Sequence, residues 1–127
     1  MIEEHHGDVT RKGWRIWPGE SFMVGVGIAF AMPPSLFQWV APRSGLASKR
    51  ITLANAPGTI DSDYRGEAGV LIVNESENPY IIHRGDRIAQ LLFQRTVFPP
   101  LEQVDSLDEL GETGRGAGGF GSTGYRA

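Results

Sequence analysis

Short apolar runs separated by glycine and proline extend along most of this chain, and none of them has a helical period. Residues 22–30 carry apolar side chains at every second position, which is the pattern of a β-strand with one buried face. Further strands are predicted at 36–41, 51–53, 70–74, 80–82 and 87–98. The last is the longest, and single helical turns are expected within 42–47 and 107–110. This spacing predicts an all-β fold, either a jelly-roll-like subunit or a distorted β-barrel.

The two ends of the chain lack this pattern. Residues 1–17 are polar and aromatic without a clear period, and no strand is predicted there. From Gly111 onward the chain is rich in glycine and loses its apolar spacing. Such a segment buries too little apolar surface to offset its ordering entropy, so we expect it to be mobile when free. The chain is therefore expected to form a β-domain over residues 1–110, followed by a lid or tail over 111–127.

Composition limits the possible functions. The 127 residues suffice for one domain with its own core, and the 17 glycines and 8 prolines favour many turns. A net charge of −3 gives no general case for nucleic-acid binding, and the absence of cysteine excludes disulfides and thiolate chemistry. No signal peptide is visible and no apolar run is long enough to cross a bilayer. We therefore expect a cytoplasmic protein without membrane contact.

The stretch from Gly58 to Glu67 carries more chemistry than a turn requires. Two carboxylates, a tyrosine and an arginine lie between glycines, directly before an apolar strand. A chain reversal needs only residues such as glycine, asparagine or aspartate, and Asp63 is explained in that way. Asp61 could be a turn former too. However, it follows Ile60 at the expected strand end, where partial desolvation would favour its use as a general base.

Two other polar segments border predicted strands. In residues 42–47, the guanidinium of Arg43 and the hydroxyl of Ser44 could contact a phosphate, or the segment could form only a strand-ending turn. Residues 85–91 could form only a turn followed by the start of a strand. Gln90 nevertheless places an amide within an apolar run, where a buried amide needs a partner. It could orient a water molecule or a phosphate.

The glycine-rich tail has features that a merely disordered segment would not need. Closely spaced glycines let backbone N–H groups converge on an anion. Arg115 adds a permanent, forked cation, and Phe120 offers a ring that could stack on a base. A clamp that closes over a phosphate and a base would use all of these features. A disordered tail is the structural alternative.

Four of these segments, in this order, resemble the trimeric all-β dUTPase family. The matching segments are PRSGLA at 42–47, GTIDSDYRGE at 58–67, GDRIAQL at 85–91 and RGAGGFGSTG at 115–124. The resemblance covers roughly residues 18–124. It implies a jelly-roll-like subunit of the β-clip type and a homotrimer with active sites at the subunit junctions. The implied reaction is hydrolysis of dUTP to dUMP and diphosphate with Mg²⁺.

The resemblance also implies a role for each matching residue. Asp61 would activate the water that attacks the α-phosphate, and Gln90 would lie close to that water. Tyr64 would lie against the deoxyribose and exclude a 2′-hydroxyl, while Asn55 would read the uracil edge. Phe120 would cover the uracil. The phosphates would be contacted by Arg43, Ser44, Gly45, Arg115, Ser122 and Thr123.

The N-terminal region departs from the family pattern. Family members usually carry an A-G-[YFL]-D-L segment whose aspartate helps to position the hydrated metal. The nearest match here is His6-Gly7-Asp8-Val9, so Asp8 is the candidate residue for the water shell of the metal. Two alternatives stay open, the first because of this altered N-terminus and the second because the dCTP deaminases have a related fold. One is a dUTPase-like nucleotide-binding regulatory protein with weakened catalysis, and the other is a relative of the dCTP deaminases.

Overall fold

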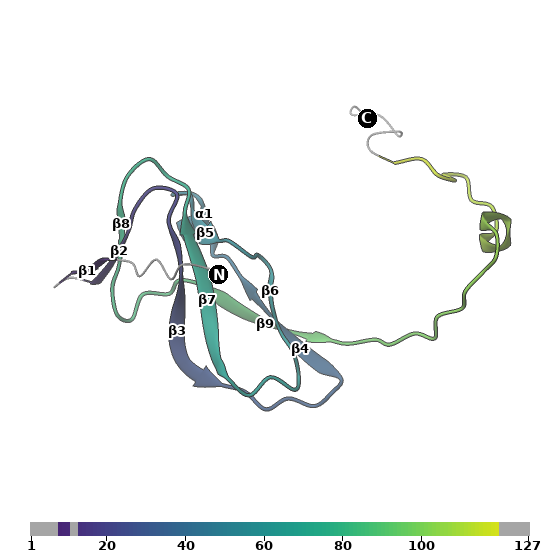
Figure 1. The fold of residues 1–127 in the computed structure, drawn as a ribbon, viewed down its shortest axis with the longest axis horizontal. Coiled ribbons are helices and arrows are strands. Elements are labelled where there is room, and N and C mark those ends of the chain that lie inside the picture. The colour runs from purple at the N-terminus through teal and green to yellow at the C-terminus, as the bar shows by residue number, and fades with distance from the viewer. Residues whose placement is uncertain (1–7, 11–12, 120–127) are drawn as a thin grey trace. The chain divides into compact units, whose positions relative to one another are not determined.

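The computed structural model describes residues 8–10 and 13–119 of the chain. These residues form short strands joined by turns, with two short helices (Figure 1). The strands are β1 (Asp8–Thr10), β2 (Gly13–Ile16), β3 (Ser21–Ala29), β4 (Leu36–Ala41), β5 (Ile51–Leu53), β6 (Gly58–Ile60), β7 (Glu67–Asn74), β8 (Tyr80–Ile82) and β9 (Gln90–Arg95). The helices are α1 (Ser44–Ala47) and the 3₁₀ helix η1 (Leu107–Leu110). The predicted all-β fold class is confirmed.

The strands form antiparallel, three-stranded sheets. Their strand orders are β1-β2-β8, β3-β7-β5 and β6-β4-β9. Strands far apart in the sequence are direct neighbours, as β3 is with β7 and β4 with β9. Within the described ranges the sheets do not close into a barrel. The fold therefore corresponds to the jelly-roll-like alternative of the prediction.

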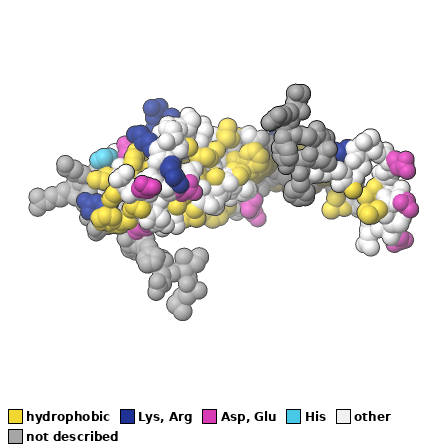
Figure 2. All heavy atoms as spheres, turned by 90° about the horizontal axis from the view of Figure 1, so that it is seen from above, with side chains coloured by type: hydrophobic (Ala, Val, Ile, Leu, Met, Phe, Trp, Pro, Cys, Tyr) yellow, Lys and Arg dark blue, Asp and Glu magenta, His cyan; other side chains and the backbone are white. Residues whose placement is uncertain are grey.

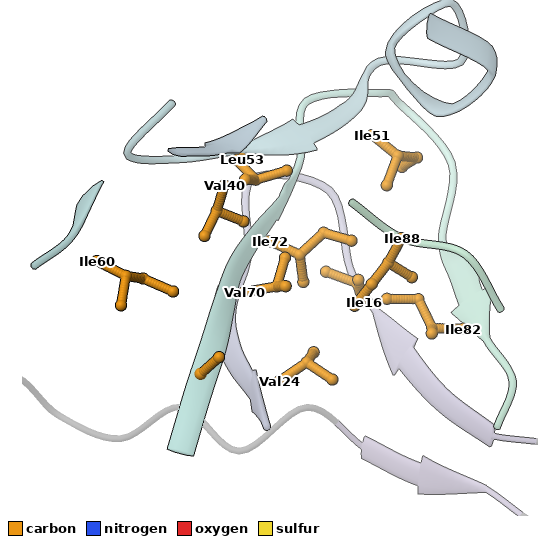
Figure 3. Close-up of a cluster of buried hydrophobic side chains, with 11 residues drawn as sticks. Ile16, Val24, Val40, Ile51, Leu53, Ile60, Val70, Ile72, Ile82 and Ile88 are labelled. Atoms are coloured by element: carbon orange, nitrogen blue, oxygen red, sulfur yellow. The ribbon is translucent and has the colours of Figure 1, made fainter. Parts of the chain in front are cut away.

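The core is a cluster of aliphatic side chains from several strands (Figure 3). In β7, Ala68, Val70 and Ile72 are buried at every second position, as expected for a strand with one core face. Figure 3 shows Val40 of β4 and Ile60 of β6 in the same cluster. Burying one such side chain contributes about 1.5–3 kcal/mol relative to exposure. The core therefore fixes β4 and β6, the two strands whose ends lead into the candidate site.

A buried asparagine ties one end of the β-sheet β3-β7-β5 to the neighbouring sheet. Asn74 is fully buried, and its Nδ2 donates to the carbonyls of Ile16, at 2.9 Å, and Asn78, at 2.8 Å. Its Oδ1 accepts from the backbone N–H and the hydroxyl of Ser76, at 2.9 and 2.7 Å. All the hydrogen-bonding capacity of this amide is used, so its burial is compensated.

The buried amide of Gln38 is different. It lies on β4 opposite Ile60 of β6 and Phe93 of β9, and it is fully buried. Neither its Oε1 nor its Nε2 has a hydrogen-bond partner among the described residues. Leaving a buried amide unpaired costs about 1–3 kcal/mol. The strand that leads to Arg43 therefore carries a destabilising group.

The structure differs from the sequence prediction at both ends of the β-domain. β1, β2 and β6 were not predicted, because at most half of their residues are apolar, whereas β5 and β8 are as short but mostly apolar. β9 has six residues and pairs with all six of β4, while the longest strand is β3, with nine. The predicted bounds of β9, Arg87 and Phe98, are both wrong, since the strand runs from Gln90 to Arg95. A turn precedes the strand, in which the carboxylate of Asp86 accepts from the N–H of His83 at 2.8 Å.

The chain divides into two compact units, residues 1–97 and 98–127. Every strand lies in the first unit. The second contains η1, at whose start Glu109 accepts from the backbone N–H of Ser106 at 2.9 Å in a capping box. The predicted functional division before Gly111 stays a prediction. No helix in the described part of the chain has the length and apolar character of a membrane span.

Candidate functional site

Asp61 stands at the end of a strand that is fixed along its whole length. β6 pairs with β4 from Gly58, opposite Val40, to Ile60, opposite Gln38. Ile60 is buried, and Asp61, the next residue, is exposed. The expected partial desolvation of Asp61 is thus absent within a single chain, because the strand turns Ile60 inward and Asp61 toward solvent. The rigid end of β6 therefore holds the Asp61 carboxylate where solvent or a ligand can reach it.

The turn after β6 holds the ring of Tyr64 in place. The hydroxyl of Tyr64 donates to the carbonyl of Glu67 at 3.1 Å, and its backbone N–H donates to the carbonyl of Asp61 at 3.2 Å. A Cβ on Gly66 would lie 2.5 Å from Cζ of the tyrosine, so a larger residue there would displace the ring. The guanidinium of Arg65 donates to two carbonyls of the same turn, at 2.7 and 3.0 Å. Arg65 therefore stabilises the turn.

The predicted base-and-sugar residues share one pocket, here called the hairpin pocket. It has a volume of about 260 Å³, and Asn55, Asp61 and Tyr64 all line it. Its walls include two residues for which the sequence suggested no role, Met23 of β3 and Glu67 of β7. An amide, a carboxylate and a phenol ring on one concave surface can recognise and orient a polar ring attached to a sugar.

The predicted phosphate-contact residues line a second pocket, here called the phosphate pocket. It has a volume of about 490 Å³ and includes Arg43, Ser44 and Gly45 at the start of α1, together with Gln90 of β9. Nε2 of Gln90 donates to the carbonyl of Pro42 at 2.9 Å, which ties β9 to the segment before Arg43. A guanidinium, a hydroxyl and an amide here can bind an anion. Other lining residues are Leu46, Tyr80, Gly85, Asp86, Arg87 and Ile88.

The two pockets have no lining residue in common. Asp61 and Gln90, the predicted catalytic pair, therefore line different pockets of the single chain. Large apolar side chains are exposed in this unit, and Figure 2 shows apolar side chains spread over the surface. Trp39 of β4 and Leu92 of β9, which face each other in the ladder, are 37% and 42% exposed, and Phe93 is 58% exposed. Trp39 and Leu92 therefore form an exposed apolar pair on one face of the sheet, and Phe93, the next residue of β9, lies on the opposite face.

The described part of the tail forms a local loop. Nε of Arg115 donates to the carbonyl of Gly118 at 2.7 Å, and the N–H of Gly118 donates back to the carbonyl of Arg115 at 3.1 Å. Gly116 has a φ of 51°, a conformation that favours glycine. The guanidinium is thus exposed on a glycine turn. The other predicted tail residues lie outside the described residues, namely Phe120, Ser122 and Thr123.

The predicted metal-shell residue lies at the edge of the described chain. Asp8 is in β1, opposite Arg15 of β2, and its side chain is outside the description. Among the described residues, no group of three or more His, Asp or Glu side chains is placed to hold a metal ion.

Sequence reasoning missed several residues that line the pockets. Arg87 and Tyr80 belong to the phosphate pocket, and Met23 and Glu67 to the hairpin pocket. Glu67 lies in the polar segment 58–67 and Arg87 in the polar segment 85–91. Their charged side chains could have identified them as candidate site residues. Tyr80 fits the apolar pattern of its strand and was not distinguished from core residues. Met23 lies between the alternating apolar positions of its strand, and this phase was the available signal.

Solved structures of similar fold define the class of protein. The dUTPase of Staphylococcus bacteriophage 80alpha with dUpNHpp has a TM-score of 0.76 and 25% identity, covering 92% of this chain and 88% of that one. A mutant dUTPase of phage phi11 of S. aureus, which coordinates a structural Mg(II) ion, has a TM-score of 0.67 and 22% identity, with 85% and 91% covered. The chain thus has the β-clip fold of the all-β dUTPases.

Sequence relatives identify the family. The dUTPase family model matches residues 10–124. The deoxyuridine 5′-triphosphate nucleotidohydrolase of Corynebacterium jeikeium is 51% identical over 117 residues, which are 91% of this chain and 76% of that protein. The enzyme of the same name from Methylocella silvestris is 51% identical over 111 residues, 87% and 68% of the two chains. The chain belongs to the dUTPase family, which confirms the resemblance seen in its motifs.

Proposed function

We propose that the chain hydrolyses dUTP to dUMP and diphosphate, with Asp61 as the base that activates the attacking water. The observation that carries this proposal is the hairpin pocket, in which a carboxylate at a rigid strand end lies beside a fixed tyrosine ring. Asp61 is exposed and available to accept a proton. A positioned carboxylate base of this kind contributes about 10²- to 10⁴-fold to a rate.

We further propose that the active site is shared between copies of the chain. The two pockets alone do not require this, because a third pocket of the same chain shares lining residues with both of them. The nucleoside would occupy the hairpin pocket of one copy, and its triphosphate would extend into the phosphate pocket of another. Trp39, Leu92 and Phe93 offer apolar surface for such an assembly. A homotrimer would give three sites of equal composition and would desolvate Asp61, which a single chain leaves exposed.

The reaction needs mainly positioning and charge stabilisation. Water attacks the α-phosphate, its proton passes to Asp61, and diphosphate leaves as the bond to the bridging oxygen breaks. Gln90, held by its bond to Pro42, would orient the water or an adjacent phosphate oxygen. Arg43, Ser44 and Gly45 would hold the phosphates, as cations and donors that stabilise the developing charge.

Steric exclusion would determine which nucleotides the site accepts as substrates. Tyr64, whose hydroxyl donates to the carbonyl of Glu67, would form a wall that leaves no space for a 2′-hydroxyl. Asn55 would read the polar edge of uracil. A narrow pocket discriminates strongly when a larger group has to displace a fixed wall. A tight hairpin would likewise exclude the 5-methyl group of thymine, so dUTP is expected to react much faster than UTP and dTTP.

Magnesium fits this site as an ion carried by the triphosphate. The described residues offer no cage of three acidic or histidine ligands, and Mg²⁺ commonly binds through substrate phosphates and water. When bound, it would neutralise charge on the phosphate oxygens. Asp8 remains the candidate for an outer contact through water. The tail would close the site, with Arg115, Ser122 and Thr123 on the phosphates and Phe120 over the uracil.

A nucleotide panel tests the proposed function. With Mg²⁺ present, diphosphate and dUMP should appear from dUTP in equal amounts, while UTP and dTTP react much more slowly. Tight dUTP binding without diphosphate release would instead indicate a regulatory nucleotide-binding protein. Loss of cytosine absorbance with dCTP would indicate a deaminase.

A further inference from the structure

Glu67 lines the hairpin pocket and links two strands that are distant in sequence. It is the first residue of β7, and its Oε1 accepts from the backbone N–H of Gly27 in β3 at 2.6 Å. The same carboxylate passes over Gly25, where an added Cβ would lie 2.6 Å from Oε1. The side chain therefore occupies a defined position across the β3–β7 pair.

The contact lies where the ladder between the two strands is interrupted. β3 and β7 pair regularly as far as Gly25, opposite Gly69, and pair again at Ala29, opposite Glu67. Three residues of β3, 26–28, therefore face Ala68 alone, as in an extended bulge. Backbone N–H groups in a bulge lose their ladder acceptors. The carboxylate of Glu67 supplies the missing acceptor to Gly27.

Glu67 also fixes Tyr64, which lines the hairpin pocket. Its backbone carbonyl accepts the hydroxyl of Tyr64 at 3.1 Å. The first residue of a strand is the part most prone to local opening, above all beside an interrupted ladder. Anchoring the side chain to Gly27 therefore steadies the carbonyl that orients the tyrosine.

We propose that Glu67 is a positioning residue for Tyr64 and sets the discrimination between deoxyribonucleotide and ribonucleotide. The inference rests on the proposed function, because it assigns Glu67 to the sugar wall of the same site. Its effect is transmitted through Tyr64, so it concerns the 2′-position of the substrate and not the attacking water.

The test compares Glu67→Ala with Glu67→Gln. Both variants remove the same charge, but glutamine keeps an oxygen that can accept from Gly27. The measured quantity is the ratio of kcat/KM for dUTP to kcat/KM for UTP. Glu67→Ala should lower this ratio about tenfold, the scale expected for a loosened positioning group, and Glu67→Gln should stay within about twofold of wild type. Glu77→Ala, which removes an exposed carboxylate in a loop outside both pockets, is the matched control.

A second variant tests the contact between Glu67 and Gly27 by a change in β3. Gly25→Ala should displace the carboxylate by steric contact and lower the ratio as Glu67→Ala does. The double variant should be no worse than either single variant, since both break one contact. An unchanged ratio in Glu67→Ala, an equal fall in Glu67→Gln, or additive losses would each overturn the proposal.

The design separates this inference from the proposed function. If the wild-type chain does not hydrolyse dUTP, the proposed function fails. The positioning role is then measured as the ratio of the Kd values for UMP and dUMP, with the same variants and the same expected order. If the wild type is active and the ratio is unaffected in all variants, only the positioning role fails.

Discussion

Replacing Asp61 by asparagine is expected to lower kcat for dUTP by about 10²- to 10⁴-fold, the usual contribution of a general base. Asparagine has almost the same shape and preserves the turn, but it cannot accept a proton from water. The backbone contact from Tyr64 N–H to the carbonyl of residue 61 does not depend on the side chain. Binding of a non-hydrolysable dUTP analogue should therefore change little.

The measurement is steady-state diphosphate release, combined with analogue binding by calorimetry. Asp63→Asn is the matched control, because Asp63 lies two residues further along the same turn and does not line the hairpin pocket. It should keep most of the activity. If Asp61→Asn retained wild-type kcat, or Asp63→Asn lost as much, the assignment of Asp61 would be wrong.

Deleting residues 115–127 is expected to reduce kcat/KM for dUTP by about 10²-fold or more. The deletion removes Arg115, and an arginine that stabilises the charge of a phosphoryl group can contribute several orders of magnitude. It also removes the glycine turn around Gly116, and it removes Phe120, whose ring is proposed to cover the uracil. The strands all lie in the first unit, so the midpoint of thermal unfolding should be nearly unchanged.

The control is deletion of residues 125–127 alone, which follow the last position matched by the family model. That shorter deletion should keep most of the activity. Full activity after removal of 115–127 would show that the tail is not a lid. A large fall in the unfolding temperature would show that the tail supports the β-domain.

The sequence predicted the fold well where strands were bounded by strong turn signals. β4, β5 and β8 begin and end where expected, because proline, glycine or a polar turn closes each of them. β2 and β6 escaped prediction because at most half of their residues are apolar, and their pairing depends on partners elsewhere in the chain. These short strands therefore form because of tertiary pairing, which the local sequence pattern does not reveal.

The candidate site was predictable as a set of residues but not as an arrangement. The structure places Asn55, Asp61 and Tyr64 in one pocket and Arg43 with Gln90 in another. Their separation depends on how β4, β6 and β9 pair. The link from Glu67 to Gly27 also required the structure, since it joins residues 40 positions apart across a bulge.

Mixing two inactive variants tests most directly whether dUTP is hydrolysed at sites formed by different copies of the chain. Arg43→Ala damages the phosphate pocket and Asp61→Asn damages the hairpin pocket. Each variant alone should be nearly inactive. Equal amounts co-refolded into random oligomers should regain about a quarter of wild-type dUTP turnover, because a quarter of the sites then combine two intact pockets. No recovery in oligomers shown to contain both variants would contradict a shared site and the proposed division of the chemistry between copies.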